Sequence, residues 1–297
     1  MTLEEQIRLK NFVDRDYEVK GFSNLLDKGD HHIMIVCGAD GIGKTSLLTR
    51  LVDECGRRSR RLVKVRYPGF GEFDYLMVMR QVIDALGENY FRPLLDLINY
   101  FTVPDYKPKI ILELNGSIEV AKSAKFVNST VGDIIGIKNV QLPPRSDMRV
   151  PEEERVIRLS KQFFSDLNAA VAALTADMGN NPMIIFVDDM EKMTESTRAW
   201  LWASVLRSVL DSTLKNVKFV LGIHDAPACD QFMEAITQVA RLQPLEEGHI
   251  TEYLNKRLKE VDQSLIDKVV AVSKGLPMTV ATMVDSYLLK YPDRRAS

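Results

Sequence analysis

Short apolar runs rich in β-branched residues alternate along the chain with segments whose apolar residues recur at helical spacing. Such runs are typical of strands buried on both faces of a parallel sheet. The pattern predicts strands at Ile33–Cys37, Leu62–Tyr67, Met183–Val187 and Val217–Ile223. It predicts helices between and beside them at Lys44–Glu54, Tyr75–Leu86, Glu152–Met178 and Thr194–Leu210.

From Asp225 onward the pattern is wholly helical. The helices are expected at Gln231–Gln238, Glu246–Val261, Gln263–Ser273 and Thr279–Leu289. Strands that alternate with helices indicate an α/β fold with a parallel sheet, and the helical tail indicates a small second subdomain. We therefore predict an α/β domain over residues 1–225, with an irregular or hairpin-like insertion over 105–151, and a helical lid over 226–297.

Composition narrows the function classes. The 297 residues are 45% hydrophobic and 27% charged, an ordinary globular balance that can bury a sizeable core. The formal net charge of −2 lacks the basic excess of dedicated nucleic-acid binders, so nucleic acid is an unlikely partner. The three scattered cysteines form no zinc or redox spacing, and no apolar run is long enough to span a membrane, so we expect a soluble, cytoplasmic protein.

The strongest chemical signal is the octapeptide GADGIGKT, which follows the first predicted strand and opens the first long helix. It fits the phosphate-binding pattern GxxxxGK[ST], in which small residues let backbone N–H groups turn onto phosphate oxygens. Lys44 is expected to reach the β- and γ-phosphates during catalysis, and Thr45 to ligate Mg²⁺. The residues expected to bind nucleotide in this loop are Gly38, Asp40, Gly41, Ile42, Gly43, Lys44, Thr45 and Ser46.

A second signal is the acidic sequence that follows the strand Met183–Val187. An enzyme with this phosphate-binding loop needs a carboxylate on a neighbouring strand to hold Mg²⁺, and Asp188 is placed for that role. Hydrolysis also needs a group that orients or deprotonates water, for which both Asp189 and Glu191 are candidates. His224, at the end of the strand Val217–Ile223, could hydrogen-bond the γ-phosphate.

Two further segments resemble motifs of a known family. FVDRDYE, which starts at Phe12, resembles the hhGRxxE motif of STAND-type NTPases and some AAA+ proteins, with Asp14 where glycine is usual. In those proteins the segment lines the adenine and ribose pocket, which implies that Val13 contacts the adenine edge and Arg15 braces the loop. SKGLPMTV resembles the GxP motif of the helical lid, which implies that Pro277 packs near the nucleotide.

These resemblances imply a P-loop NTPase whose parallel sheet is sandwiched by helices and followed by a helical lid. The favoured function is a STAND signalling switch of the NACHT or NB-ARC kind, in signal transduction or bacterial immunity. It would use ATP, ADP and Mg²⁺, hydrolyse slowly, self-associate, and act with sensor or effector domains on the same or separate chains. The alternative is an AAA+ ATPase of the origin-recognition type, but Met278 and Thr279 stand where a sensor II arginine is usual.

A basic run, Arg57–Arg61, is expected where the helix after the loop ends. Cations there complement the negative end of the helix dipole. A contact with an acidic partner, or an arginine acting on a neighbour's nucleotide, is the other interpretation.

Overall fold

The computed structural model describes residues 2–27, 31–103, 150–176, 181–225 and 231–296. The insertion expected at 105–151 therefore lies almost wholly outside the described residues. The chain divides into two compact units. The first comprises residues 1–91 and 164–297, and the second comprises residues 92–163. Every site residue discussed below belongs to the first unit. Within the described ranges, no helix combines the length and apolarity needed to cross a membrane.

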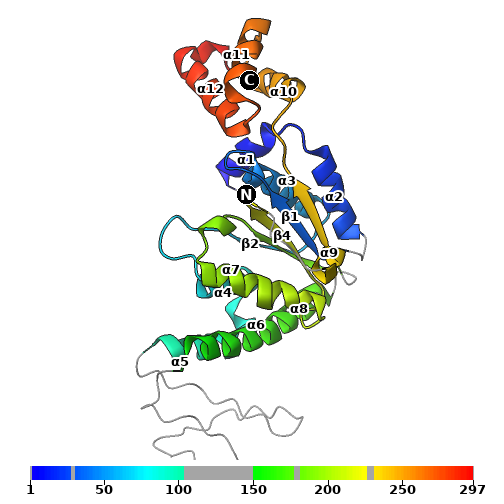
Figure 1. Ribbon diagram of the computed structural model, residues 1–297, viewed down its shortest axis with the longest axis vertical. Coiled ribbons are helices and arrows are strands. Elements are labelled where there is room, and N and C mark those ends of the chain that lie inside the picture. Colours follow the sequence, from blue (N-terminus) through cyan, green and yellow to red (C-terminus); the bar gives the residue numbers. More distant parts are fainter. Residues whose placement is uncertain (1, 28–30, 104–149, 177–180, 226–230, 297) are drawn as a thin grey trace, which may run out of the picture. The chain divides into compact units, whose positions relative to one another are not determined.

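A five-stranded parallel sheet forms the centre of the first unit (Figure 1). Its strands lie in the order β2-β3-β4-β1-β5. They are β1 (Ile33–Cys37), β2 (Leu62–Val65), β3 (Met183–Val187), β4 (Val217–Ile223) and β5 (Thr237–Arg241). The bounds of β1, β3 and β4 are as predicted, β2 ends two residues before Tyr67, and the α/β fold class is confirmed.

The fifth strand corrects the prediction that the chain is wholly helical after Asp225. The helix expected at Gln231–Gln238 ends at Ile236, and Thr237–Arg241 then pairs in parallel with β1. The sequence TQVAR mixes helix-forming glutamine, alanine and arginine with two β-branched residues, so its local pattern favours neither structure. Hydrogen bonding to β1 decides the outcome. The sheet thus takes in residues that the sequence assigned to the lid.

Each predicted helix has a counterpart in the structure, and three helices were not predicted. The helices are α1 (Leu3–Lys10), α2 (Asp16–Asp27), α3 (Lys44–Arg57), α4 (Tyr75–Leu86), α5 (Arg92–Thr102), α6 (Glu152–Thr175), α7 (Glu195–Trp200), α8 (Arg207–Leu210), α9 (Gln231–Ile236), α10 (Glu247–Arg257), α11 (Gln263–Ser273) and α12 (Pro277–Lys290). Short 3-10 helices lie at Glu88–Tyr90, Met190–Lys192 and Pro292–Arg294. The helix predicted at Thr194–Leu210 contains a π-helical segment, Leu201–Leu206, between α7 and α8. Helices α1, α2 and α5 were missed.

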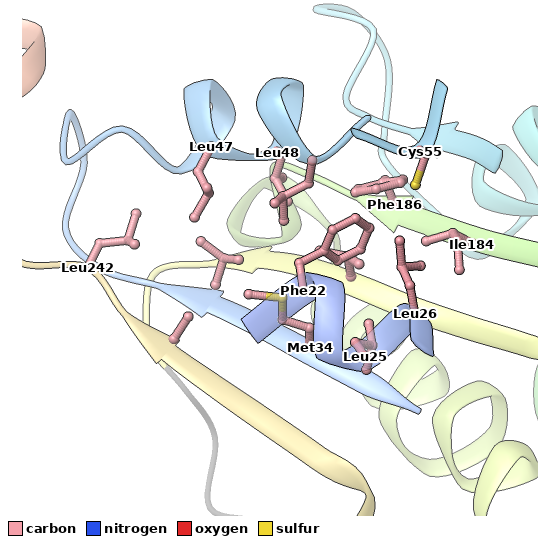
Figure 2. Close-up of a cluster of buried hydrophobic side chains, with 14 of the residues drawn as sticks. Phe22, Leu25, Leu26, Met34, Leu47, Leu48, Cys55, Ile184, Phe186 and Leu242 are labelled. Carbon is pink, nitrogen blue, oxygen red and sulfur yellow. The ribbon is translucent and has the colours of Figure 1, made fainter. Parts of the chain in front are cut away.

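One hydrophobic cluster joins α2 and α3 to the sheet. Side chains alternate along a strand, so Met34, Val36, Phe186 and Val220 share the face that these helices cover. Phe22 of α2 is fully buried, with its ring centroid 6.0 Å from that of Phe186. Figure 2 shows Phe22 among the side chains that converge from α2, α3 and the strands. This packing fixes α3, the helix that follows the phosphate-binding loop, against the sheet.

A second hydrophobic cluster forms the core of the lid. It contains Ile250 and Leu254 of α10, Ile266 and Val269 of α11, and residues of α12. Figure 1 shows these three helices gathered as one bundle. Proline is favoured at the first position of a helix because its missing N–H is not needed there, and α12 accordingly begins at Pro277, two residues before the predicted start.

Candidate nucleotide-binding site

The loop from Gly38 to Thr45 connects β1 to α3, as the sequence predicts. Two of its glycines have left-handed backbone angles, with φ +77° at Gly41 and +98° at Gly43, which side chains would strain. Lys44 is only 7% exposed, and its Nζ donates to the Gly38 carbonyl oxygen at 2.8 Å. The loop therefore has the backbone curvature and the inward-facing cation that a phosphate group needs.

The two predicted magnesium ligands lie together. The Thr45 hydroxyl donates a hydrogen bond to the Asp188 carboxylate, which also accepts from the Asp189 N–H at 2.9 Å. Burial raises the pKa of Asp188, and these two hydrogen bonds oppose that effect. Mg²⁺ prefers hydroxyl and carboxylate oxygens and takes further ligands from water and phosphate. The donor set of Thr45 and Asp188 fits this ion.

Gly222 of β4 makes room for the Asp188 carboxylate. Strand register pairs Val187 with Leu221, so the next residues, Asp188 and Gly222, are neighbours. A Cβ at Gly222 would lie 2.7 Å from Asp188 Oδ1 and 2.9 Å from Leu48 Cδ1. The sequence analysis did not single out this residue, although a lone glycine inside an apolar strand is a signal of close approach.

The candidate water-positioning residues lie in different surroundings. Asp189 has a left-handed backbone, with φ +58°, and its Oδ1 lies 2.7 Å from Lys192 Nζ. That hydrogen bond raises the pKa of Lys192, whose Nζ lies 5.4 Å from the centroid of the Tyr67 ring. Glu191 has a buried Oε2 that accepts no hydrogen bond within the described chain. Asp189 is thus paired with a cation and Glu191 is not, and both stay candidates.

His224 follows β4, which lies between the loop strand β1 and the acidic strand β3. The His224 carbonyl accepts from the Gly38 N–H at 2.9 Å, so its backbone adjoins the start of the loop. Its side chain is 47% exposed, and Nδ1 lies 2.8 Å from Asp225 Oδ2. The structure therefore places the residue beside the loop, with its imidazole paired to a neighbouring carboxylate.

The segment before α2 reaches the loop through Arg15. This side chain is 6% exposed, and its Nη2 donates to the carbonyl oxygens of Ile42 at 3.3 Å and Gln243 at 2.7 Å. The backbone φ is +62° at Asp14, which explains how aspartate can stand where glycine is usual, since aspartate tolerates this region better than most residues. The side chain of Val13 packs into the hydrophobic cluster of the lid.

The GxP segment of the lid also contacts the loop. The Met278 N–H donates to the Gly41 carbonyl oxygen at 3.1 Å. A Cβ built at Gly43 would lie 3.6 Å from Cγ of Pro277, so the proline ring packs against that glycine. Leu276 packs against the cluster that joins α2 and α3 to the sheet. The structure thus brings Pro277 to the phosphate-binding loop.

The basic run at the end of α3 makes contacts within its own chain. Arg57 pairs with Asp53 at 2.9 Å, and Arg58 pairs with Glu54 and Asp27 at 2.8 Å each. Hydrogen bonds to these carboxylates raise the pKa of Arg58 despite the opposing effect of burial. These contacts agree with a structural role near the helix end.

The sheet, the loop between β1 and α3, and Asp188 at the end of β3, one strand beyond β4, define a P-loop NTPase. The model of the AAA ATPase domain family matches residues 11–221, and the chain belongs to that family. Among curated proteins no match is found.

The chain is similar to several solved structures. Cdc6p from Pyrobaculum aerophilum has a TM-score of 0.50 at 12% identity, over 95% of this chain and 65% of its own. A STAND protein with a tetratricopeptide repeat sensor from Pyrococcus horikoshii has a TM-score of 0.45 at 12% identity, over 90% of this chain and 28% of its own. AMPPCP-bound DnaA from Aquifex aeolicus has a TM-score of 0.44 at 12% identity, over 93% and 63%. The chain spans less than two thirds of each of these proteins.

Proposed function

We propose that this protein binds adenine nucleotide with Mg²⁺ and hydrolyses ATP slowly. The observation that carries the proposal is the hydrogen bond between Thr45 and Asp188, beside a buried Lys44 on the phosphate-binding loop. Three groups that follow β1 and β3, on either side of β4, thereby meet where a metal-bound triphosphate needs a cation, a hydroxyl and a carboxylate. Membership of the AAA ATPase domain family supports the same activity.

Each residue has a distinct task in this proposal. Lys44 balances charge on the β- and γ-phosphates, and Thr45 and Asp188 would hold Mg²⁺, which would supply further positive charge beside the phosphoryl oxygens. Asp189 or Glu191 orients the attacking water. Val13 contributes backbone contacts to the adenine, and His224 a hydrogen bond to the γ-phosphate.

We further propose that the nucleotide sets the position of the lid and thereby controls self-association, as in a STAND signalling switch. Support comes from the contacts of Met278 with Gly41 and of Pro277 with Gly43, because they join the lid to the phosphate-binding loop. A ligand shifts such an equilibrium only when it binds the two lid positions with different affinity. The lid in this proposal follows β5 rather than beginning at residue 226.

A DNA-associated AAA+ ATPase remains the second candidate. The matched family region, residues 11–221, ends before the lid, so the family match fits this candidate as well as it fits the first. The expectation that nucleic acid is an unlikely partner stays a prediction. Fluorescence anisotropy with labelled single- and double-stranded DNA, with and without ATP, distinguishes the candidates, since nucleotide-dependent DNA binding favours the second.

The binding proposal is tested by calorimetry of ADP and a non-hydrolysable ATP analogue, with Mg²⁺. Lys44→Ala should abolish binding, because it removes the cation from the loop. Lys10→Ala, on helix α1, is a matched control for loss of a lysine. Unchanged affinity in a folded Lys44→Ala protein would contradict the proposed site.

A further inference from the structure

The segment Phe12–Arg15 is held by the lid helix α10. Lys256 Nζ donates to the Phe12 carbonyl oxygen at 2.6 Å. The Val13 side chain, 9% exposed, belongs to the same hydrophobic cluster as Ile250 and Leu254. On the same helix, His249 Nε2 lies 3.7 Å from Asp14 Oδ1. Three kinds of contact therefore bind this segment to the lid.

The same segment is also held to the phosphate-binding loop. Asp14 Oδ2 lies 3.3 Å from Arg15 Nη1, and Arg15 donates onward to the carbonyl oxygen of Ile42 in the loop. The side chains thus form a continuous path from His249 through Asp14 and Arg15 to the loop. This path is separate from the contact of the lid at Met278 and Gly41.

The backbone of this path is strained. Asp14 and Arg15 have consecutive positive φ angles, +62° and +76°, and neither is glycine. Such conformations persist only where the surroundings hold them, and they occur mostly at functional sites. Arg15 is held by its buried hydrogen bonds, and Asp14 by its contacts with Arg15 and His249. Glycine would adopt this φ without strain, so the aspartate adds a carboxylate at a conformational cost.

Hydrogen bonding of the His249 side chain within the lid does not explain why a histidine stands at this position. Its Nδ1 is buried and has no hydrogen-bond partner among the described residues. A buried polar atom without a partner is destabilising, so an apolar side chain would suit this position better on packing grounds alone. The contact of its Nε2 with Asp14 is a reason for a histidine at this position.

We propose that Asp14 and His249 are positioning residues that tie lid helix α10 to the phosphate-binding loop through Arg15, and so prolong the stay of the bound nucleotide. The inference rests on the proposed nucleotide binding. Losing the pair leaves the lid held by its GxP segment, by the Lys256–Phe12 hydrogen bond and by the packing of Val13, so that the lid opens more often. Partly exposed ion pairs contribute modestly, which predicts a dissociation rate about two- to five-fold higher.

A double-mutant cycle tests the proposal. The variants are Asp14→Asn, His249→Gln and the double variant, and stopped-flow fluorescence measures the release of a fluorescent ADP analogue with Mg²⁺. Each single variant should release the analogue about two- to five-fold faster, and the double variant no faster than the singles. Asp285→Asn is the control, since it breaks the exposed Arg257–Asp285 pair of the lid and should release at the wild-type rate.

Unfolding in urea without nucleotide separates positioning from folding. Asp14→Gly relieves the backbone strain but removes the carboxylate, so it should unfold no more easily than wild type and still release the analogue faster. Wild-type release rates, or effects of the two single variants that multiply in the double variant, would overturn the proposal. A wild-type protein that binds no ADP would instead refute the proposed function, and the positioning role with it.

Discussion

Replacing Gly222 with alanine should weaken the magnesium site without touching any ligand. The added Cβ would lie 2.7 Å from Asp188 Oδ1 and 2.9 Å from Leu48 Cδ1, both closer than real Cβ contacts. Leu48 is buried in the cluster beneath α3 and has little room to move. The carboxylate stands at the end of a strand, so it is the group that should yield.

The size of the effect follows from what the carboxylate would lose. Asp188 accepts hydrogen bonds from Thr45 and from the Asp189 N–H at 2.9 Å, and displacement weakens both. Overpacking of this kind costs about 1–3 kcal/mol. If about half of that falls on the metal site, the apparent affinity for Mg²⁺ drops about two- to ten-fold, since ~1.4 kcal/mol is a factor of ten.

The assay is a Mg²⁺ titration of ATP-analogue binding, followed by calorimetry, with urea unfolding as the measure of stability. Gly56→Ala is the matched control. Gly56 lies on the same helix as Thr45, and a Cβ added there would meet no atom within 4 Å. The control should bind Mg²⁺ as wild type does. A folded Gly222→Ala protein with wild-type Mg²⁺ dependence would refute the reasoning that Asp188 holds the metal where the structure places it.

Three further predictions follow from the site and the core. Asp188→Ala should impair Mg²⁺-dependent nucleotide binding in calorimetry. Asp189→Ala or Glu191→Ala should spare binding and lower kcat in a phosphate-release assay. Normal turnover in both of these last two variants would place the water-positioning group elsewhere. Pro277→Ala should raise the ADP dissociation rate in stopped-flow measurements, because the proline ring packs on Gly43, and an unchanged rate would remove its proposed role in the switch. Burial raises the pKa of the Cys55 thiol to about 12, so alkylation followed by mass spectrometry should leave it unmodified at mildly alkaline pH until the protein unfolds. Because the unfolded thiol ionises near 9.0 and the folded one does not, this residue's contribution to stability is present below that pH and is lost as pH rises toward 12, and urea titrations should show the loss.

The strands and the loop could be predicted because their signals are local. IMIVC and MIIFV are continuous apolar runs, and their observed bounds agree with the runs. The phosphate-binding motif fixes its own geometry through glycines at set positions. Strand β5 lacks such a signal, since only its pairing with β1 makes it a strand. Helix α1 buries no residue, although its capping box of Thr2 and Glu5 is a start signal that the sequence analysis passed over.

The residues of the candidate site were proposed one by one from the sequence, but the contacts between segments distant in the sequence were not. The spacing of Thr45 and Asp188 along the chain says nothing of their hydrogen bond, which needs the order of the strands in the sheet. Lys192 lies beside Asp189 because a 3-10 turn follows the left-handed backbone at that aspartate. His249 lies on a helix whose pattern indicates only a lid. These contacts arise from tertiary packing, which periodicity does not encode.

The lid's two attachments to the loop differ in kind, and this difference bears on how such a switch could be tuned. The bond from the Met278 N–H to the Gly41 carbonyl oxygen is between backbone atoms, so most residues at position 278 could make it. The path through Asp14 and His249 depends on side chains at both ends. Substitution at either end should therefore change how long nucleotide stays bound while leaving the loop's own geometry intact. If the protein is the proposed nucleotide-dependent switch, substitutions at Asp14 or His249 change the dwell time of the nucleotide without changing the chemistry at Asp188.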